Sequence, residues 1–443
     1  MRAERACQLI AIACLTVSLA SAQVSTDPAV ASWRRNLDGT KGKGGNAAIQ
    51  AIVGAIDADV ESARYTATNV YVGAAGIPSH VVGPFPGNPN TPADQNWSFR
   101  ISRTPQAATG VHTATGLGQI GALVNGVPIF NAKDAMSWNN QGIWNRNAMY
   151  WEAQSFDTGL GHPTMSGVYH YHQQPTLLRA QRGDNGIDHS PLIGFGFDGF
   201  PIYGPYGFAN PDGTGGVTRI RTSYQTRNIT ERTTLPDGTV LPMSQHGPPV
   251  NATYPLGAFV EDFEYVAGLG DLDEYNGRSG VTPEYPAGTF AYFATIDANG
   301  VSAYPYLLGP RYWGVLDTGN TGPGGGHVTV PGTATTYAPF SVYLNEFELG
   351  GAGRISLAGA VANSTIAVAY SLSGLGPTSF PFGDMALSLP IFRVATLHAD
   401  ATGLATTNFP IGAGHVGSTI YIQALKLGTP RELSTAERVV VLP

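Results

Sequence analysis

The chain has 443 residues, of which 12% are charged and 42% hydrophobic, and its formal net charge is −7. The negative charge disfavours a nucleic-acid partner, because binding to phosphates relies on lysine and arginine, and the apolar share is too high for a disordered chain. The 57 glycines and 32 prolines favour a turn-rich, mainly β protein over a helical bundle.

Residues 1–22 have the pattern of an export signal. A positively charged start is followed by a mostly apolar stretch and by the small residues Ala20-Ser21-Ala22, where a signal peptidase can cut. We therefore expect a secreted protein (extracellular, periplasmic or on the cell surface) whose mature chain begins near Gln23. Beyond the signal no apolar run reaches membrane-spanning length, so we expect no transmembrane segment.

Both cysteines, Cys7 and Cys14, lie within the expected signal. The mature protein would therefore contain no thiol, which excludes disulfides, zinc–thiolate clusters, iron–sulfur centres and cysteine nucleophiles. Any metal site must then be built from imidazole and carboxylate groups.

A segment rich in glycine, threonine and proline, residues 316–336, divides the chain. We interpret it as a linker, because turn residues gather between domains. Before it we expect an N-terminal segment, residues 23–64, and a large β-rich domain, residues 65–315. After it we expect a small C-terminal β-sandwich-like module, residues 337–443.

Runs of β-branched and aromatic residues between turn residues predict short strands in both parts. The one helix that we predict is 47–63, where apolar residues recur at helical spacing. The expected strands are 69–72, 97–102, 124–130 and 290–296 in the large domain, and 340–349, 364–371 and 419–425 in the terminal module.

The main chemical signal is a cluster of four histidines around Tyr169-His170-Tyr171-His172. In an extended strand successive side chains alternate between faces, so His170 and His172 share one face and the two tyrosines take the other. The Cα atoms of the two histidines are then about 6.5 to 7 Å apart. Two imidazoles so placed can bind one metal ion.

Further ligands are expected from His162, in Gly161-His162-Pro163, and from His189, in Asp188-His189-Ser190. Both lie in turn-like contexts from which a loop can deliver an imidazole. Nitrogen ligands without sulfur favour copper or zinc as the metal. The alternative is a structural core in which neutral imidazoles are hydrogen-bonded to carboxylates or backbone carbonyls.

Two carboxylates are candidate catalytic residues. Asp198 lies among alternating glycines and aromatics, where it can be a metal ligand, a partner of a ligand or a base; the alternative is a turn, since Asp-Gly is a common hairpin pair. Glu274 lies in the acidic run 271–278, which is also typical of a solvated loop. The amides and indoles of 138–147 can line a site for a small molecule or a carbohydrate, or form a buried polar loop.

Several segments, in this order, resemble the YHYH domain family, whose name is the tetrapeptide at 169–172. They include Gly161-His-Pro, Gly167-Val-Tyr-His-Tyr-His, His189-Ser-Pro-Leu-Ile-Gly, Phe197-Asp-Gly-Phe-Pro-Ile-Tyr-Gly and Leu272-Asp-Glu-Tyr-Asn-Gly. The resemblance implies an exported domain and assigns no activity. Many relatives repeat the tetrapeptide near the end of the domain, whereas this chain has Phe290-Ala-Tyr292-Phe293 there, so the resemblance implies a single histidine centre.

The sequence supports two hypotheses about function. In the first, a secreted metalloprotein holds copper or zinc with His162, His170, His172 and His189, supported by Asp198, and acts as a metal-dependent oxidase or hydrolase. In the second, the protein is a non-catalytic extracellular binding or structural module. The terminal module resembles β domains at the ends of large secreted bacterial proteins, which implies a sorting, spacing or stabilising role.

Overall fold

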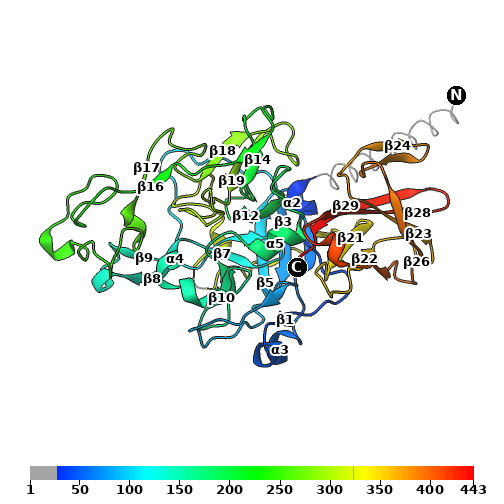
Figure 1. Ribbon diagram of the computed structural model, residues 1–443, viewed down its shortest axis with the longest axis horizontal. Coiled ribbons are helices and arrows are strands. Elements are labelled where there is room, and N and C mark those ends of the chain that lie inside the picture. The colour runs from blue at the N-terminus through cyan, green and yellow to red at the C-terminus, as the bar shows by residue number, and fades with distance from the viewer. Residues whose placement is uncertain (1–26, 323) are drawn as a thin grey trace.

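The computed structural model describes residues 27–322 and 324–443, so the expected signal peptide and the mature start at Gln23 lie outside the described residues. Strands dominate, as the composition predicts, and helices are few and short. Figure 1 shows an elongated molecule with the C-terminal module, coloured orange to red, at one end. No helix in the described part of the chain is long and apolar enough to cross a membrane.

The large domain is organised around a mixed eight-stranded sheet. Its strands pair antiparallel except for β11 with β7 and β13 with β19, which run parallel. The central strands β6 and β12 are buried along their whole length, as expected for strands covered on both faces. The spatial order is β10 (Gly161–Pro163), β11 (Tyr169–Tyr171), β7 (Pro128–Phe130), β6 (Gln119–Leu123), β12 (Leu192–Gly196), β13 (Pro201–Tyr203), β19 (Thr289–Phe293) and β18 (Gly277–Gly280).

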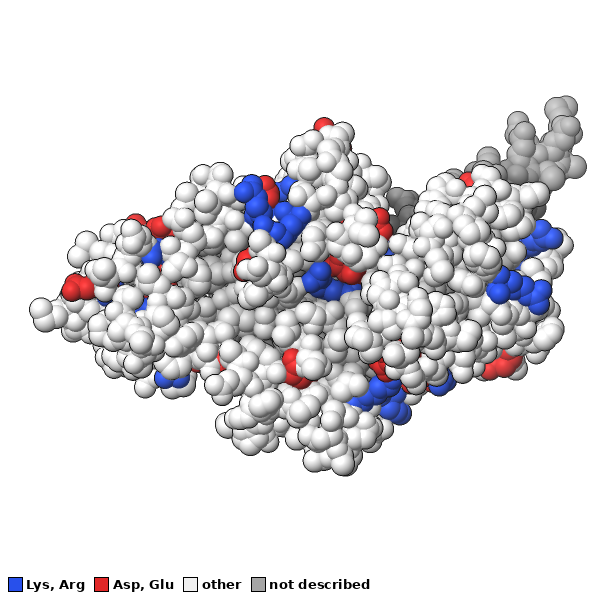
Figure 2. Space-filling view, in the orientation of Figure 1, with Lys and Arg blue, Asp and Glu red and all other residues white. Residues whose placement is uncertain are grey.

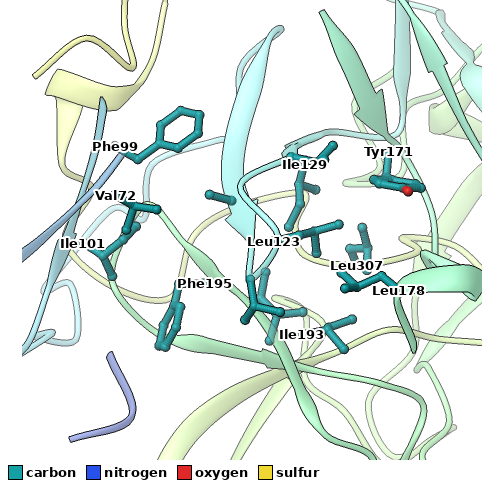
Figure 3. Close-up of a cluster of buried hydrophobic side chains, with 14 of the residues drawn as sticks. Val72, Phe99, Ile101, Leu123, Ile129, Tyr171, Leu178, Ile193, Phe195 and Leu307 are labelled. Atoms are coloured by element: carbon teal, nitrogen blue, oxygen red, sulfur yellow. The ribbon is translucent and has the colours of Figure 1, made fainter. Parts of the chain in front are cut away.

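A second, antiparallel sheet of four strands shares its core with the first. Along β5 (Trp97–Ser102) every second residue is buried, which is the alternation of a strand with one face on the core. Figure 3 shows Phe99 and Ile101 of this sheet in one cluster with Phe195 of the eight-stranded sheet. The order of its strands is β20 (Thr335–Thr336), β2 (Val60–Tyr65), β3 (Asn69–Ala74) and β5.

The predicted helix 47–63 is correct only in its first half. Helix α3 spans Ala47–Val53; it begins after Asn46, whose side chain accepts a hydrogen bond from the Ile49 amide, and ends at Gly54. The later residues form β2 instead, because Val60 and Ala63 pair with β3 and are buried in the core. Tertiary pairing overrides the helical spacing here. The other helices are α2 (Pro28–Ala31), α4 (Ala148–Trp151) and α5 (Thr176–Gln181).

The predicted strand 124–130 contains a turn. Asn125 and Gly126 connect β6 to β7, and Gly126 has a φ of 79°, a left-handed conformation that glycine adopts readily. Asn-Gly is a typical hairpin pair, concealed here by the apolar residues around it. The other strands predicted for this domain are present as β3, β5 and β19.

The C-terminal module has two antiparallel sheets and a core of its own, as the prediction of a small β-sandwich requires. Its core includes Val342 and Leu344 from one sheet and Ile366 and Ile422 from the other. One sheet has the order β21 (Ser341–Asn345), β22 (Arg354–Ala358) and β27 (Ala405–Asn408). The other has β26 (Phe392–His398), β23 (Thr365–Ser371), β28 (Thr419–Lys426) and β29 (Glu432–Val440), and a hairpin of β24 (Thr378–Phe380) and β25 (Gly383–Met385) lies beside them.

The segment 316–336, predicted as a linker, packs along the large domain. The Asn320 side chain accepts a hydrogen bond from the Arg100 amide at 2.9 Å and donates one to the Arg100 carbonyl at 2.6 Å. The Val328 amide donates to the Ser98 carbonyl at 2.9 Å. These contacts lie on β5, so the glycines and prolines of this segment shape an ordered strap against the sheet.

An extension from the large domain lies at the end of the molecule opposite the C-terminal module (Figure 1). Within it the Trp144 ring is buried and Asn145 donates to the Glu261 carboxylate at 2.6 Å. Residues 139–142 are exposed, so the segment 138–147 is a buried polar loop only in part. Figure 2 shows charged side chains in small separate groups on a mostly uncharged face. The extension has two hairpins, β8 (Lys133–Ser137) with β9 (Asn145–Asn147) and β16 (Tyr224–Thr226) with β17 (Phe263–Tyr265); elsewhere β14 (Tyr206–Phe208) pairs with β15 (Val217–Arg219), and β1 (Lys43–Gly44) with β4 (Val81–Val82).

A buried ion pair joins the N-terminal segment to the C-terminal module. Arg34 Nε lies 2.8 Å from Asp59 Oδ2, and both side chains are almost fully buried. The Tyr343 hydroxyl donates to the same Asp59 oxygen at 2.8 Å, and the Arg34 guanidinium donates to the Leu344 carbonyl. Because each charge is compensated inside the protein, the pair can remain ionised away from water.

We expect Asp59→Asn to destabilise the protein by about 3 to 5 kcal/mol, because it leaves the Arg34 guanidinium buried without its counter-ion. Asn tolerates the positive φ of 60° at this position, so the loss of stability measures the effect of removing the carboxylate charge and not backbone strain. The measurement is the free energy of unfolding from urea titration.

The matched control is Asp57→Asn, whose partner Lys41 is 47% exposed while Asp57 is 41% exposed. A surface pair of this kind is worth about 0 to 1 kcal/mol. Equal losses of stability in Asp59→Asn and Asp57→Asn would contradict the interpretation of Arg34 and Asp59 as a buried ion pair that stabilises the protein.

Candidate metal centre

The pairing of β10 with β11 brings two histidines face to face. In the antiparallel register His162 stands directly opposite His170. His172 follows β11 on the same face as His170, since side chains two residues apart in a strand point the same way. All three residues are buried, each 3% exposed. The structure thus brings together three of the four predicted ligands.

The three imidazoles converge through their Nε2 atoms. The distance from His170 Nε2 is 3.1 Å to His162 Nε2 and 3.0 Å to His172 Nε2. The ligand atoms of these three histidines all lie within 4.8 Å of one another. Among residues 27–322 and 324–443, no other group of three or more histidine, cysteine, aspartate or glutamate side chains is placed to hold a metal ion in this way.

The other ring nitrogen of each imidazole has a fixed partner. His170 Nδ1 lies 3.0 Å from the Val168 carbonyl and His172 Nδ1 lies 2.5 Å from the Asn131 carbonyl. A carbonyl can only accept, so both Nδ1 atoms carry the proton. His162 Nδ1 lies 2.6 Å from Ser155 Oγ, whose hydroxyl already donates to a backbone carbonyl, so this Nδ1 also donates. All three Nε2 atoms therefore present lone pairs.

Burial keeps these imidazoles neutral. Burial, and then the neighbouring His172, lowers the pKa of His162 to about 3, and burial lowers the pKa of His172 to about 4. Burial and the two neighbouring imidazoles also lower the pKa of His170 well below its usual value. At neutral pH the three rings are in the form that binds metal ions.

A carboxylate that the sequence did not indicate completes the group. Glu152, the residue after α4, places Oε2 3.4 Å from His172 Nε2 and 3.9 Å from His162 Nε2. This oxygen is buried, and none of the described residues donates a hydrogen bond to it. Burial, and then the Asp134 carboxylate, raises the pKa of Glu152 to about 7. No spacing pattern marks Glu152, because a turn in the chain returns it to the histidines.

The group lies in the wall of a cleft of about 780 Å³. The Phe130 ring stacks on the His170 ring, with centroids 3.9 Å apart. The rim is largely apolar and includes Leu117, Met136 and the 93% exposed Met165. A ligand in this cleft can therefore reach the histidine nitrogens and still contact apolar side chains.

His189, the fourth predicted ligand, is not brought to this group. It precedes β12, which is three strands away from β11 in the sheet, or about 14 Å at ordinary strand spacing. Its Nδ1 lies 2.8 Å from the Ser190 carbonyl, and its ring packs between Tyr203 and Phe208. Burial lowers the pKa of His189 to about 4, as expected of a neutral core imidazole.

The two predicted catalytic carboxylates lie elsewhere. Asp198 follows β12, is buried, and accepts hydrogen bonds from the Tyr292 hydroxyl at 2.6 Å and the Gly314 amide at 2.8 Å. Glu274 precedes β18, at the end of the sheet opposite β10, and lines a separate cavity of about 380 Å³ with Arg311. Asp198 and Gly199 lie in the turn between β12 and β13, which pair antiparallel, in agreement with the turn interpretation of Asp198.

The fold and the site define a mainly β protein with a buried three-histidine cluster on a sheet edge, open to a cleft. Residues 98–304 match the sequence model of the YHYH protein family, so this region is a member of the YHYH family, as the resemblance implied. It contains β10, β11 and all three histidines. Comparison with curated proteins found no match, and comparison with solved structures found none.

Asp198 gives a pH-dependent prediction. Burial raises its pKa to about 6 from the ordinary 3.8, so between these pH values the folded state binds the proton more tightly than the unfolded chain. Its protonation stabilises the fold fully below pH 4, and this contribution is lost as the pH rises through 6.

We therefore expect the stability of the native protein, relative to Asp198→Asn, to fall by about 2 kcal/mol from pH 4 to pH 7. Urea unfolding of both proteins at the two pH values measures this difference. A difference that stayed constant, or rose with pH, would show that Asp198 is ionised in the fold at pH 4.

Proposed function

We propose that His162, His170 and His172 bind a single metal ion through their Nε2 atoms. The observation that carries this proposal is the convergence of three imidazole lone pairs whose Nδ1 protons are all committed elsewhere. Three acceptors facing one another repel, and a cation among them converts that repulsion into attraction. Buried acceptors are usually paired with donors, whereas here three imidazole acceptors lie side by side.

The spacing of the nitrogens supports a first-row metal. Ligands at 2.0 to 2.1 Å from a tetrahedral ion lie about 3.3 Å from each other, and the two Nε2 pairs are at 3.0 and 3.1 Å. Imidazole nitrogens without a sulfur ligand favour copper or zinc. Glu152 Oε2, 3.4 Å from His172 Nε2, is close enough to be a fourth ligand or to bind a metal-coordinated water.

We further propose that the centre performs metal-assisted hydrolysis. Three protein ligands and a position facing a cleft are typical of catalytic zinc sites, in which the metal lowers the pKa of a bound water. Glu152 would accept a proton from this water as its oxygen attacks a carbonyl carbon, and would return the proton to the leaving group. Oxidation would be the favoured reaction if the metal were copper.

We also propose that the protein is exported and acts outside the cytoplasm, on the strength of the pattern in residues 1–22. N-terminal sequencing of the protein recovered from the periplasm or medium should begin at Gln23. Recovery only from the cytoplasm, with the first residues intact, would contradict export.

Metal analysis of the mature protein tests the centre. After dialysis against zinc or copper and removal of excess metal, we expect about one ion per chain in the native protein and none in His170→Ala/His172→Ala, because two of the three imidazoles are gone. His189→Ala is the matched control. It removes an imidazole that lies outside the group but is also buried and bonded to a backbone carbonyl through Nδ1, and this variant should keep the full metal content.

Glu152→Gln separates binding from catalysis. We expect it to retain the metal and to slow metal-dependent hydrolysis of 4-nitrophenyl acetate by about 10² to 10⁴, as for loss of a general base. Equal, substoichiometric metal in all four proteins would overturn the metal centre, whereas a fully loaded protein with no hydrolytic activity would overturn only the proposed reaction.

A further inference from the structure

The face of β11 opposite the histidines carries a second buried network. The Tyr169 hydroxyl donates to Asp157 at 2.9 Å, and the Tyr171 hydroxyl lies 2.8 Å from His80 Nε2. His80 Nδ1 lies 2.9 Å from the Val81 carbonyl and so carries the proton, which makes Tyr171 the donor in its bond with His80. All these groups are buried.

Asp157 is the centre of this network. Besides the Tyr169 hydroxyl, its carboxylate accepts hydrogen bonds from the amides of Gly83 at 2.8 Å, Gly159 at 2.9 Å and Gly161 at 3.2 Å. Gly161 is the first residue of β10 and immediately precedes His162. One carboxylate thus connects the strand that carries His162 to the strand that carries His170.

The Tyr169 ring also fixes the position of β10. A Cβ placed on Gly161 would lie 2.5 Å from both Cζ and Oη of Tyr169, so the ring covers the backbone of Gly161 closely. The Asp157 amide donates to the Gly161 carbonyl at 2.9 Å. The start of β10 is therefore held by bonds from the turn before it and by an aromatic ring from the strand beside it.

We propose that Asp157 and Tyr169 are positioning residues of the metal centre, which set the register of β10 against β11 and thereby place His162 opposite His170. The inference rests on the proposed metal centre. Its physical reason is that a strand alternates with a period of two, so a shift of one residue would turn His162 away from His170. The three-residue strand β10 has too few backbone bonds to fix this register alone.

The test is cobalt(II) binding by the full mature chain, followed by titration and by the visible absorption of the bound ion. We expect Asp157→Asn to weaken binding by about 10- to 100-fold, as for other groups that orient a ligand, and to change the cobalt spectrum to that of His162→Ala. Tyr169→Phe is a milder variant that should also weaken cobalt binding. It provides the test if Asp157→Asn does not fold.

A double-mutant cycle tests whether Asp157 influences cobalt affinity through the position of His162. Because Asp157 acts through His162, Asp157→Asn should have no further effect on cobalt affinity once His162→Ala is present. Tyr171→Phe is the matched control: it removes a buried hydroxyl from the same strand face, one that bonds His80 at 2.8 Å and lies at the longer distance of 3.4 Å from the Tyr169 hydroxyl. It should change the affinity far less than Asp157→Asn or Tyr169→Phe does.

Several results would overturn the inference: native affinity in both Asp157→Asn and Tyr169→Phe, equal losses with and without His162, or an equal loss in Tyr171→Phe. Failure of the native protein to bind cobalt, zinc or copper would instead overturn the metal centre itself.

Discussion

The site depends on the antiparallel contact of β10 with β11. This register sets His162 opposite His170, and the alternation of an extended chain puts His172 on the same face. Tyr169 and Tyr171 then point to the opposite face of β11. There their hydroxyls form hydrogen bonds with Asp157 and His80. The two faces of one short strand therefore carry the candidate metal ligands on one side and the hydrogen-bonded tyrosines on the other.

The polar groups of the candidate metal centre and the buried Asp198 differ in their hydrogen bonding. The oxygens of the buried Asp198 accept from a tyrosine hydroxyl and a backbone amide, as buried polar groups usually do. The three histidine Nε2 atoms face other acceptors, and Glu152 Oε2 has no donor among the described residues. Such local conflicts reduce stability and tend to persist at functional sites.

The rest of the architecture keeps this site on a rigid support. The sheet that carries β10 and β11 shares its core with the four-stranded sheet, and the strap 316–336 lies against the latter. The C-terminal module has a separate core and is joined through the Arg34–Asp59 pair, which also receives the Tyr343 hydroxyl. The module contributes no residue to the cleft that contains the three histidines.

The sequence by itself determined the mainly β fold, most of the strands and the shared face of His170 and His172, because alternation is a property of a single extended segment. It could not separate a helix at 47–63 from a helix followed by β2, since Val60 and Ala63 take their conformation from pairing with β3. Only the tertiary structure decided which groups lie beside His170 and His172. Of the candidates named from the sequence it places His162 there and leaves His189, Asp198 and Glu274 elsewhere, and it adds Glu152, which the sequence did not indicate. The physical reason is that distances across a sheet follow from the order of its strands, and no single segment encodes that order.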